Sequence, residues 1–261
     1  MLLPPVPVEA DVVAGLLVLL RVSSLVIFLP VLGHQLVPQQ AKIGLIGILT
    51  LLLYPVVRGS LPELNLTPLT MGLMAAQEML IGGMLALLAQ LMFGAVQMAG
   101  QVMSYQMGMA IANVFDPASS AQIAIIGQFA VVLAMLMWLA VGAHHAMLLG
   151  LADSFTLFPM GHAWSVGGWQ QLSDAAANLF ILSIRLSAPV LLLMFLSYAA
   201  LGLLSRAVPQ IQIFFVSFPL TISLGLVVFA LSLPAFMSLM GDNFSSFALQ
   251  IPYFLKALAG G

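Results

Sequence analysis

The chain has 261 residues, of which 62% are hydrophobic and only 5% are charged, and its formal net charge is −2. A water-soluble domain carries roughly a quarter charged residues, so this chain has too few to cover a globule that faces water. The composition excludes an ordinary soluble protein and predicts an all-α integral membrane protein. The length leaves no room for a separate soluble domain.

Cysteine, histidine and basic residues give little support to catalysis or nucleic-acid binding. The chain has no cysteine, which excludes disulfides, thiolate metal sites and cysteine nucleophiles, and it has no basic patch for nucleic acid. His144 and His145 are adjacent and project about 100° apart on a helix, and the common catalytic motifs are missing from the sequence. We expect no enzymatic activity, metal or other cofactor. A haem subunit that also uses His34 or His162 is an alternative.

Six apolar segments follow one another along the chain and are predicted to be helices. They are residues 12–32, 43–57, 69–100, 121–151, 179–204 and 211–240. A helix needs about 20 apolar residues to cross a bilayer, so the second segment is marginal as a span and the third is overlong. Lys and Arg usually mark the cytoplasmic side. Here Lys42 and Arg206 would fall on one side and Arg58 and Lys256 on the other, which leaves the topology open.

Small residues recur at every fourth position in two places. Such a row forms one strip along a helix, where another backbone can approach closely. The first row is Gly100, Ser104, Gly108 and Ala112, and the second is Gly142, Ala146, Gly150 and Ser154. Both rows predict tight helix packing but do not indicate the partner helix.

Three glutamines lie on one face of the same predicted helix as the first row. Gln90, Gln97 and Gln101 are separated by seven and four residues, which is helical spacing. They can bond to a neighbouring helix or line a hydrated passage, and the sequence leaves both open. Nine of the chain's 17 methionines lie between Met71 and Met109. Because Met adapts to irregular partners, this cluster fits either a core or a deformable seal.

Glu78 and Arg185 are single ionisable residues inside long apolar segments. Such residues usually have a partner or a function at membrane depth. The two have opposite signs, so an ion pair between them can form. Arg21 lies about two turns into the first segment and can instead extend its charged end toward the membrane surface. Only Glu78 is placed for proton transfer, which disfavours a pump that works alone.

Two short stretches are predicted to interrupt the helices. Pro117 disfavours helical structure at Asp116, and Ser119 or Ser120 can cap the next helix, so residues 111–120 are predicted to form a loop. Irregular backbone at membrane depth is tolerated only inside protein or at a water-filled cavity, which makes this loop a candidate plug. The plug and gate residues are Met103, Met107, Met109, Asn113, Phe115, Asp116 and Pro117.

The second interruption is a predicted break in the helix at residues 206–212. Pro209 lacks a backbone N–H and disfavours helix at the residue before it. Arg206 and Gln210 are then placed to bond exposed carbonyls or a neighbouring hairpin.

Two motifs carry a resemblance to a known family. Residues 100–117 read G-Q-V-M-S-Y-Q-M-G-M-A-I-A-N-V-F-D-P, and residues 206–210 read R-A-V-P-Q, followed by Ile213, Phe214, Phe215 and Pro219. These motifs, the order of the apolar segments and the total length resemble the FliR family of flagellar type III export-gate proteins. Virulence secretion systems contain a related subunit.

The resemblance implies an architecture and a set of partners. FliR-like proteins assemble with FliP and FliQ into a helical export gate in the bacterial inner membrane, at the flagellar basal body, next to FlhB and FlhA. The gate passes unfolded export substrates and performs no covalent chemistry. Residues 1–178 would then be a FliP-like helical part, and residues 179–261 a FliQ-like helical hairpin with a tail. In this family the loop that matches residues 111–120 is thought to obstruct the closed gate. The virulence equivalent and a small secondary transporter or ion channel remain as alternatives.

Overall fold

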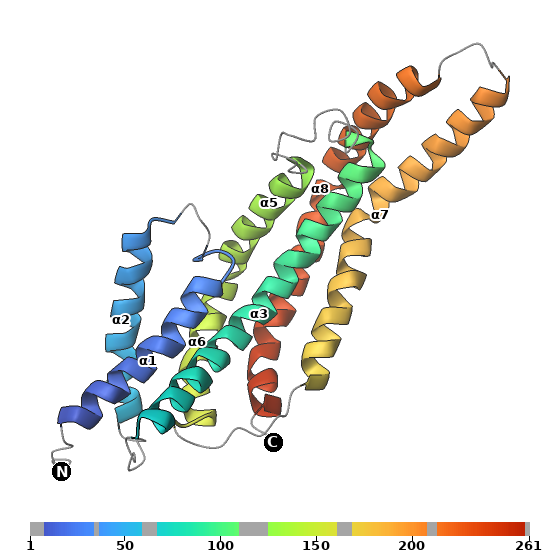
Figure 1. The fold of residues 1–261 in the computed structure, drawn as a ribbon. Coiled ribbons are helices and arrows are strands. Elements are labelled where there is room, and N and C mark those ends of the chain that lie inside the picture. The colour runs from blue at the N-terminus through green and yellow to red at the C-terminus, as the bar shows by residue number, and fades with distance from the viewer. Residues whose placement is uncertain are drawn as a thin grey trace. The chain divides into compact units, whose positions relative to one another are not determined.

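The chain forms long helices. The computed structural model describes residues 8–33, 37–58, 67–109, 125–160, 169–207 and 213–258, and within these ranges it contains seven α-helices and no strand (Figure 1). The helices are α1 (Val8–Phe28), α2 (Gln39–Val57), α3 (Pro68–Gln106), α5 (Ile125–Val141), α6 (Ala143–Leu157), α7 (Trp169–Ala207) and α8 (Ile213–Leu258). The all-α prediction is confirmed.

Several of these helices are long and apolar enough to cross a membrane. Among the described residues, α1, α2, α3, α7 and α8 qualify, and α5 with α6 counts as a sixth span if the pair is taken together. At 1.5 Å per residue, the 39 residues of α3 span roughly 58 Å, about twice the thickness of the bilayer's hydrocarbon core. Helices α3, α7 and α8 therefore exceed what a simple vertical span requires.

The chain divides into two compact units. The first unit contains residues 1–91, 142–175 and 246–261, and the second contains residues 92–141 and 176–245. Helices α3, α7 and α8 contribute residues to both units.

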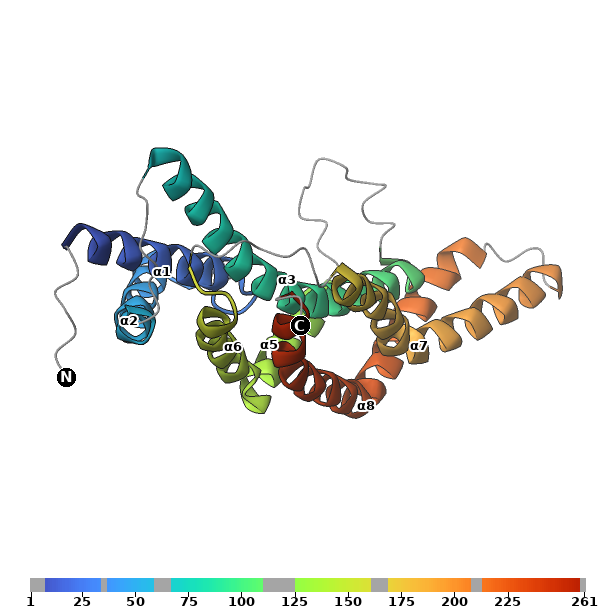
Figure 2. The ribbon, with the colours of Figure 1, turned by 90° about the horizontal axis from the view of Figure 1, so that it is seen from below.

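The first unit packs α1 against α2, α3 and α6. Helices α1 and α2 lie side by side in every view (Figures 1 and 2). Asp11 of α1 accepts hydrogen bonds from Tyr54 at 2.7 Å and from Arg58 at 2.9 Å, which ties the two helices at one end. The apolar core of this unit includes Val18 and Leu25 of α1, Ile81 and Leu85 of α3, and Met147 and Leu151 of α6.

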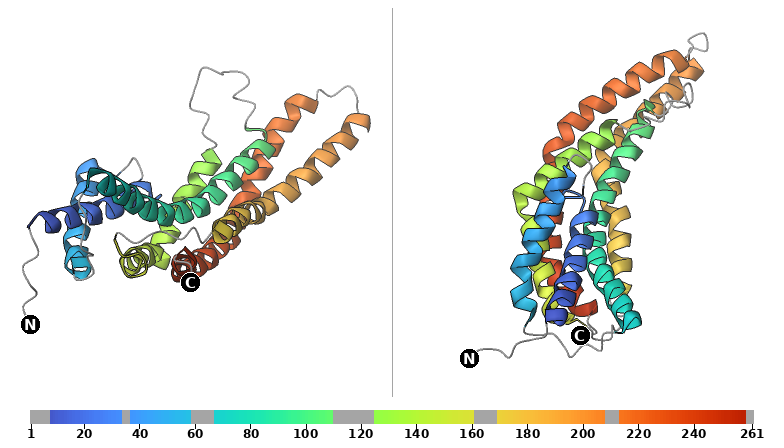
Figure 3. Two further views of the ribbon diagram at one scale, coloured as in Figure 1. Left: turned by 60° about the horizontal axis from the view of Figure 1, so that its bottom comes forward. Right: turned by 60° about the vertical axis from the view of Figure 1, so that its left-hand side comes forward.

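The second unit is built around aromatic side chains. The rings of Phe93 in α3, Trp138 in α5 and Phe244 in α8 meet with centroid distances of 5.1–5.6 Å, and Phe229 of α8 contacts Phe129 and Phe236. The C-terminal part of α7 runs beside the N-terminal part of α8 (Figure 3). The apolar segments 179–204 and 211–240 lie within these two helices.

The helix boundaries differ from the apolar segments in two ways. Gly142 has a φ of +75° and separates α5 from α6, so the predicted segment 121–151 is two helices. Helix α8 continues 18 residues past Met240, and α7 begins at Trp169 rather than near residue 179. Polar residues lie inside these extensions without ending the helix, and the side chain of Asn243 bonds back to the carbonyl of Leu239.

Candidate functional site

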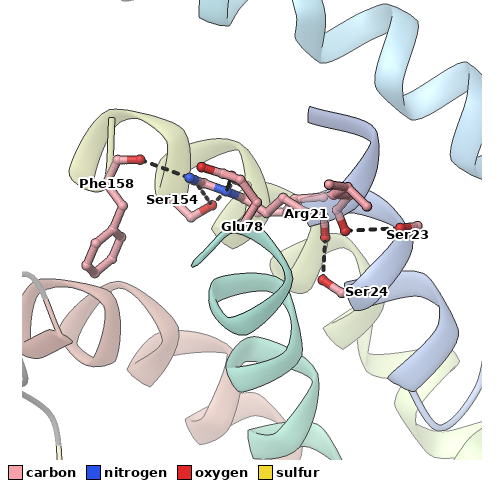
Figure 4. Close-up of polar contacts among 8 residues, drawn as sticks. Arg21, Ser23, Ser24, Glu78, Ser154 and Phe158 are labelled. Atoms are coloured by element: carbon pink, nitrogen blue, oxygen red, sulfur yellow. Dashed lines mark hydrogen bonds and ion pairs between the residues drawn. The ribbon is translucent and has the colours of Figure 1, made fainter. Parts of the chain in front are cut away.

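A buried ionic cluster joins three helices of the first unit. Arg21 of α1 and Glu78 of α3 are 0% and 1% exposed, and Arg21 Nε donates to Glu78 Oε2 at 2.5 Å (Figure 4). Arg21 Nη1 donates to the Ser154 hydroxyl of α6 at 3.1 Å, and Nη2 donates to the Phe158 carbonyl at 3.0 Å. The guanidinium also lies 4.1 Å from the centre of the Phe155 ring, which is a favourable cation–π geometry.

This cluster has the properties of a structural element. Each of the three guanidinium nitrogens has an acceptor, and the two charges cancel, as a buried pair requires. The Phe158 carbonyl lies just past the end of α6, where a helix has carbonyls without internal partners. The cluster therefore fixes α1, α3 and the end of α6 in one register.

The local sequence permits this close approach. Gly82 lies one turn after Glu78 on α3, and a Cβ atom at Gly82 would overlap the Ser24 hydroxyl and the Arg21 carbonyl oxygen. Ser24 turns its hydroxyl onto that same carbonyl at 2.9 Å. The missing side chain at Gly82 allows α3 to contact the α1 backbone, which brings the two charges within bonding distance.

The structure corrects two expectations about these charges. Glu78 pairs with Arg21 and not with Arg185, which belongs to the second unit and is exposed. Arg21 does not extend toward a membrane surface, because its side chain is fully buried. The pair is 57 residues apart in sequence, and only the shared trait of being single charges of opposite sign within apolar segments could have indicated it.

Two glycines of the first row of small residues lie close to other helices, although Gly108 follows the end of α3 and is not on a helical strip. A Cβ atom at Gly100 would overlap the backbone of Gly127 in α5, and Gly108, with a φ of +82°, lies against the Phe218 ring of α8. Ser104 is buried and bonds to the Gly100 carbonyl of its own helix. The partners are therefore α5 and α8. Ala112 lies outside the described residues.

The second row also packs closely, with one exception. Gly150 contacts the Ile251 side chain of α8, and Ser154 belongs to the ionic cluster. Gly142 is not part of the helical strip, because it is the residue that precedes α6 and has a positive φ.

Two of the candidate gate methionines lie in the core of the second unit. Met103 and Met107 are fully buried. The Met107 side chain packs on Gly225 of α8, and its carbonyl accepts a hydrogen bond from Thr221 at 3.0 Å. Met109 is partly exposed and is the last described residue before the gap at 110–124. Asn113, Phe115, Asp116 and Pro117 lie outside the described residues.

The glutamine face is open to the surroundings of the chain. Gln90, Gln97 and Gln101 are all exposed. Gln90 donates to the Phe28 carbonyl at 2.7 Å, whereas Gln97 and Gln101 make no hydrogen bond within the part of the chain that the structure describes. Tyr105, one turn further along α3, is 65% exposed. This face is available to another protein or to water.

The structure describes only some of the remaining candidate residues. Arg206 is exposed in the last turn of α7, where a positive charge is favoured by the helix dipole. Pro209 and Gln210 lie outside the described residues, as do His34 and His162. His144 and His145 have ring centroids 4.0 Å apart, and no group of metal-ligating side chains occurs in the described ranges.

The comparisons with known proteins place the chain in a family. The model of the family "Bacterial export proteins, family 1" matches residues 12–247. The chain belongs to this family. Flagellar biosynthetic protein FliR of Bacillus subtilis is 35% identical over 236 residues, which cover 89% of this chain and 90% of that protein. FliR of Escherichia coli is 32% identical, with 83% of this chain and 82% of that protein covered. FliR of Pectobacterium carotovorum is 35% identical, with 82% of each covered.

The family matches confirm the resemblance that the two motifs carry. This FliR-family chain is a flagellar biosynthesis and export protein with several helices that can cross a membrane.

Proposed function

We propose that the chain is a subunit of the flagellar type III export gate in the bacterial inner membrane, at the basal body. There it forms, with FliP-like and FliQ-like proteins, the channel for unfolded export substrates, next to FlhB-like and FlhA-like components. The observation that carries the proposal is the family match over residues 12–247. Because this is a family of export proteins and not of enzymes, the proposed role involves no covalent chemistry.

The exposed side chains of this protein support the proposal that it belongs to a membrane assembly. Large apolar side chains such as Leu51, Leu192 and Leu231 are exposed, as expected for a protein that contacts lipid or other apolar proteins. Gln97 and Gln101 of α3 and Arg185 of α7 are exposed within long apolar helices. Lipid cannot satisfy these groups, whereas a neighbouring subunit or a water-filled channel can.

Within this role the two parts of the chain resemble different gate proteins. Residues 1–178 act as the FliP-like part and residues 179–261 as the FliQ-like hairpin with its tail. The antiparallel course of α7 and α8 beside each other supports the second assignment.

Residues 111–120, in the connection between α3 and α5, act as the plug of the closed gate. They lie outside the described residues, and before them Met103 and Met107 are buried in the second unit. Thr221 of α8 donates a hydrogen bond to the Met107 carbonyl. Apolar residues such as Phe115 can fill a narrow lumen through weak contacts that are individually easy to break.

Assembly is the direct test. The chain would be co-expressed with the FliP-like and FliQ-like proteins of the same bacterium, purified through a tag on the chain, and weighed by native mass spectrometry. We expect one hetero-oligomer that contains all three proteins. Recovery of the chain alone, at yields that the partners do not change, would refute the gate assignment. Proton or ion flux through vesicles that contain only this chain would instead support the transporter alternative.

A further inference from the structure

Arg185 is an unpaired cation on an apolar helix. It is exposed on α7 and makes no hydrogen bond or ion pair with any described residue. The nearest charged residues along α7 are Asp174 and Arg206, which lie roughly 16 and 31 Å away at 1.5 Å per residue. An isolated charge within an apolar span is costly and normally has a partner. Glu78 is paired with Arg21, and no other described carboxylate, including Asp242 one turn past Leu239 on α8, forms an ion pair with Arg185. A partner for Arg185 is therefore sought outside the described residues.

A groove beside Arg185 provides a place for that partner. A small pocket of about 70 Å³ lies between α7 and α8 in the second unit. Its lining residues are Arg185, Leu186, Pro189, Ser232, Ala235, Phe236 and Leu239. Apart from Arg185 and Ser232, this lining is apolar. The groove therefore offers one positive charge beside a mostly hydrophobic surface.

Pro189 adds a second polar group at the same place. In a helix the N–H of residue 189 would bond to the carbonyl of Arg185, but proline has no N–H. The Arg185 carbonyl is thus left without its helical donor, beside the guanidinium of the same residue. Ser232 donates its own hydroxyl to the Phe229 carbonyl at 2.9 Å and keeps lone pairs that can accept a hydrogen bond.

The surroundings of the groove select the chemistry of the partner. Ile181, Ile184 and Leu192 of α7 are exposed around Arg185, and they match an apolar helix. A lipid phosphate lies at the membrane surface, whereas apolar residues flank Arg185 on both sides along α7. A carboxylate carried by a neighbouring apolar helix can reach this depth, and a guanidinium binds a carboxylate through two parallel hydrogen bonds.

We propose that Arg185 and the α7–α8 groove bind an apolar helix of a neighbouring gate subunit through an Asp or Glu within that helix. The proposal rests on the proposed function, because it requires an assembly with other membrane subunits. It adds the contact surface, the residue that selects the partner and the charge that the partner must carry.

Charge replacement tests the ion pair. In the co-expressed complex we expect Arg185→Met to lower the amount of one partner by roughly tenfold or more, because the partner's carboxylate is then left buried without a counter-charge. Arg185→Lys should give an intermediate loss, since it keeps the charge but not the paired hydrogen bonds. Lys256→Met, which removes another exposed cation from the chain, is the control and should leave the complex unchanged. The unfolding temperature of the isolated chain should be the same for all variants, because Arg185 has no partner within the chain.

A cross-link identifies what lies in the groove. The chain contains no cysteine, so Leu192→Cys introduces a single thiol two turns from Arg185 that can carry a photoreactive label. We expect a cross-link to a partner peptide that contains an acidic residue in an apolar stretch, and an Arg at that acidic position should restore the complex with Arg185→Glu. A wild-type complex that forms normally while Arg185→Met binds the same partners and the label reaches only phospholipid would overturn this proposal and leave the gate assignment intact. Failure of the wild-type chain to assemble would overturn both.

Discussion

Arg21 and Glu78 place opposite charges at a depth where neither is stable alone. A buried pair often contributes little net stability, because the desolvation of both ions offsets their attraction. The removal of one partner is different, since it leaves a buried charge without compensation. In this chain Arg21 also donates hydrogen bonds to the Ser154 hydroxyl and the Phe158 carbonyl. The main effect of the pair is therefore to fix which surfaces of α1, α3 and α6 face each other.

A double-mutant cycle can measure this coupling. We expect Glu78→Leu to lower the free energy of unfolding of the chain in detergent by about 3–5 kcal/mol, because Arg21 remains charged and buried. The double variant Arg21→Met with Glu78→Leu should recover most of that loss. Denaturant unfolding followed by circular dichroism gives both values. A single variant as stable as the wild type would mean that water reaches the pair.

Gly100 should tolerate no side chain, unlike Gly83 on the same helix. A Cβ at Gly100 meets the Gly127 backbone, whereas a Cβ at Gly83 meets nothing within 4 Å. We expect Gly100→Ala to cost about 1–3 kcal/mol, because α3 and α5 must separate. Gly83→Ala should stabilise the chain by up to about 1 kcal/mol through helix propensity. Equal unfolding midpoints for the two variants would show that α3 and α5 can move apart at Gly100 with little cost in stability.

At the residue scale the sequence predicts the kind of contact but not its partner. The four-residue spacing of Gly100, Ser104 and Gly108 indicates close helix packing, and Gly100 lies against the backbone of Gly127, whereas Gly108 lies past the end of α3. The spacing carries no information about Gly127, because that residue is brought near only by the tertiary fold. The sequence does not indicate that Arg21 pairs with Glu78, because that contact also depends on the tertiary fold.

At the scale of the helices, hydropathy locates the elements and misplaces their ends. The segment 211–240 predicts α8, yet the helix continues to Leu258, because a few polar residues lower the hydropathy of a segment without breaking the helix. Gly142 divides α5 from α6 although both sides are apolar. A glycine with positive φ breaks a helix without changing hydropathy, so an apolar window cannot detect it.

The aromatic cluster should be the main packing contact of α3, α5 and α8 in the second unit. We expect Phe244→Ala to cost about 3–5 kcal/mol, since it leaves a cavity next to Phe93 and Trp138. Phe195→Ala is the matched control, because Phe195 is 73% exposed, and a surface substitution usually changes stability by less than about 0.5 kcal/mol. Thermal unfolding of both variants in one detergent compares them. Similar losses of stability in the two variants would show that the aromatic cluster contributes no more to stability than an exposed side chain does.

For the whole molecule, composition predicts the class and long-range contacts decide the rest. A chain with 5% charged residues cannot fold as a soluble globule, and long apolar helices follow from that fact. The division into two compact units does not follow, because each unit takes residues from three or two separate stretches of the chain. The spacing of Gln97 and Gln101 predicts that they share one face of a helix. Their exposure does not follow from the spacing, because it depends on which side of α3 the other helices cover.

The proposed plug makes a prediction for the assembled gate. Deletion of residues 113–118 removes Phe115 and Pro117 from the α3–α5 connection and leaves the buried anchors Met103 and Met107 in place. The complex should therefore assemble at normal yield, while vesicles that contain it should leak ions or small solutes faster, because the loop no longer fills the lumen. Deletion of residues 61–66, six residues of the α2–α3 connection, is the matched control and should leave the vesicles tight. The measurement is dye or ion efflux per assembled complex, counted by native mass. An assembled 113–118 deletion complex that stays as tight as the wild type would exclude this loop as the barrier, and the seal would then have to lie in a neighbouring subunit.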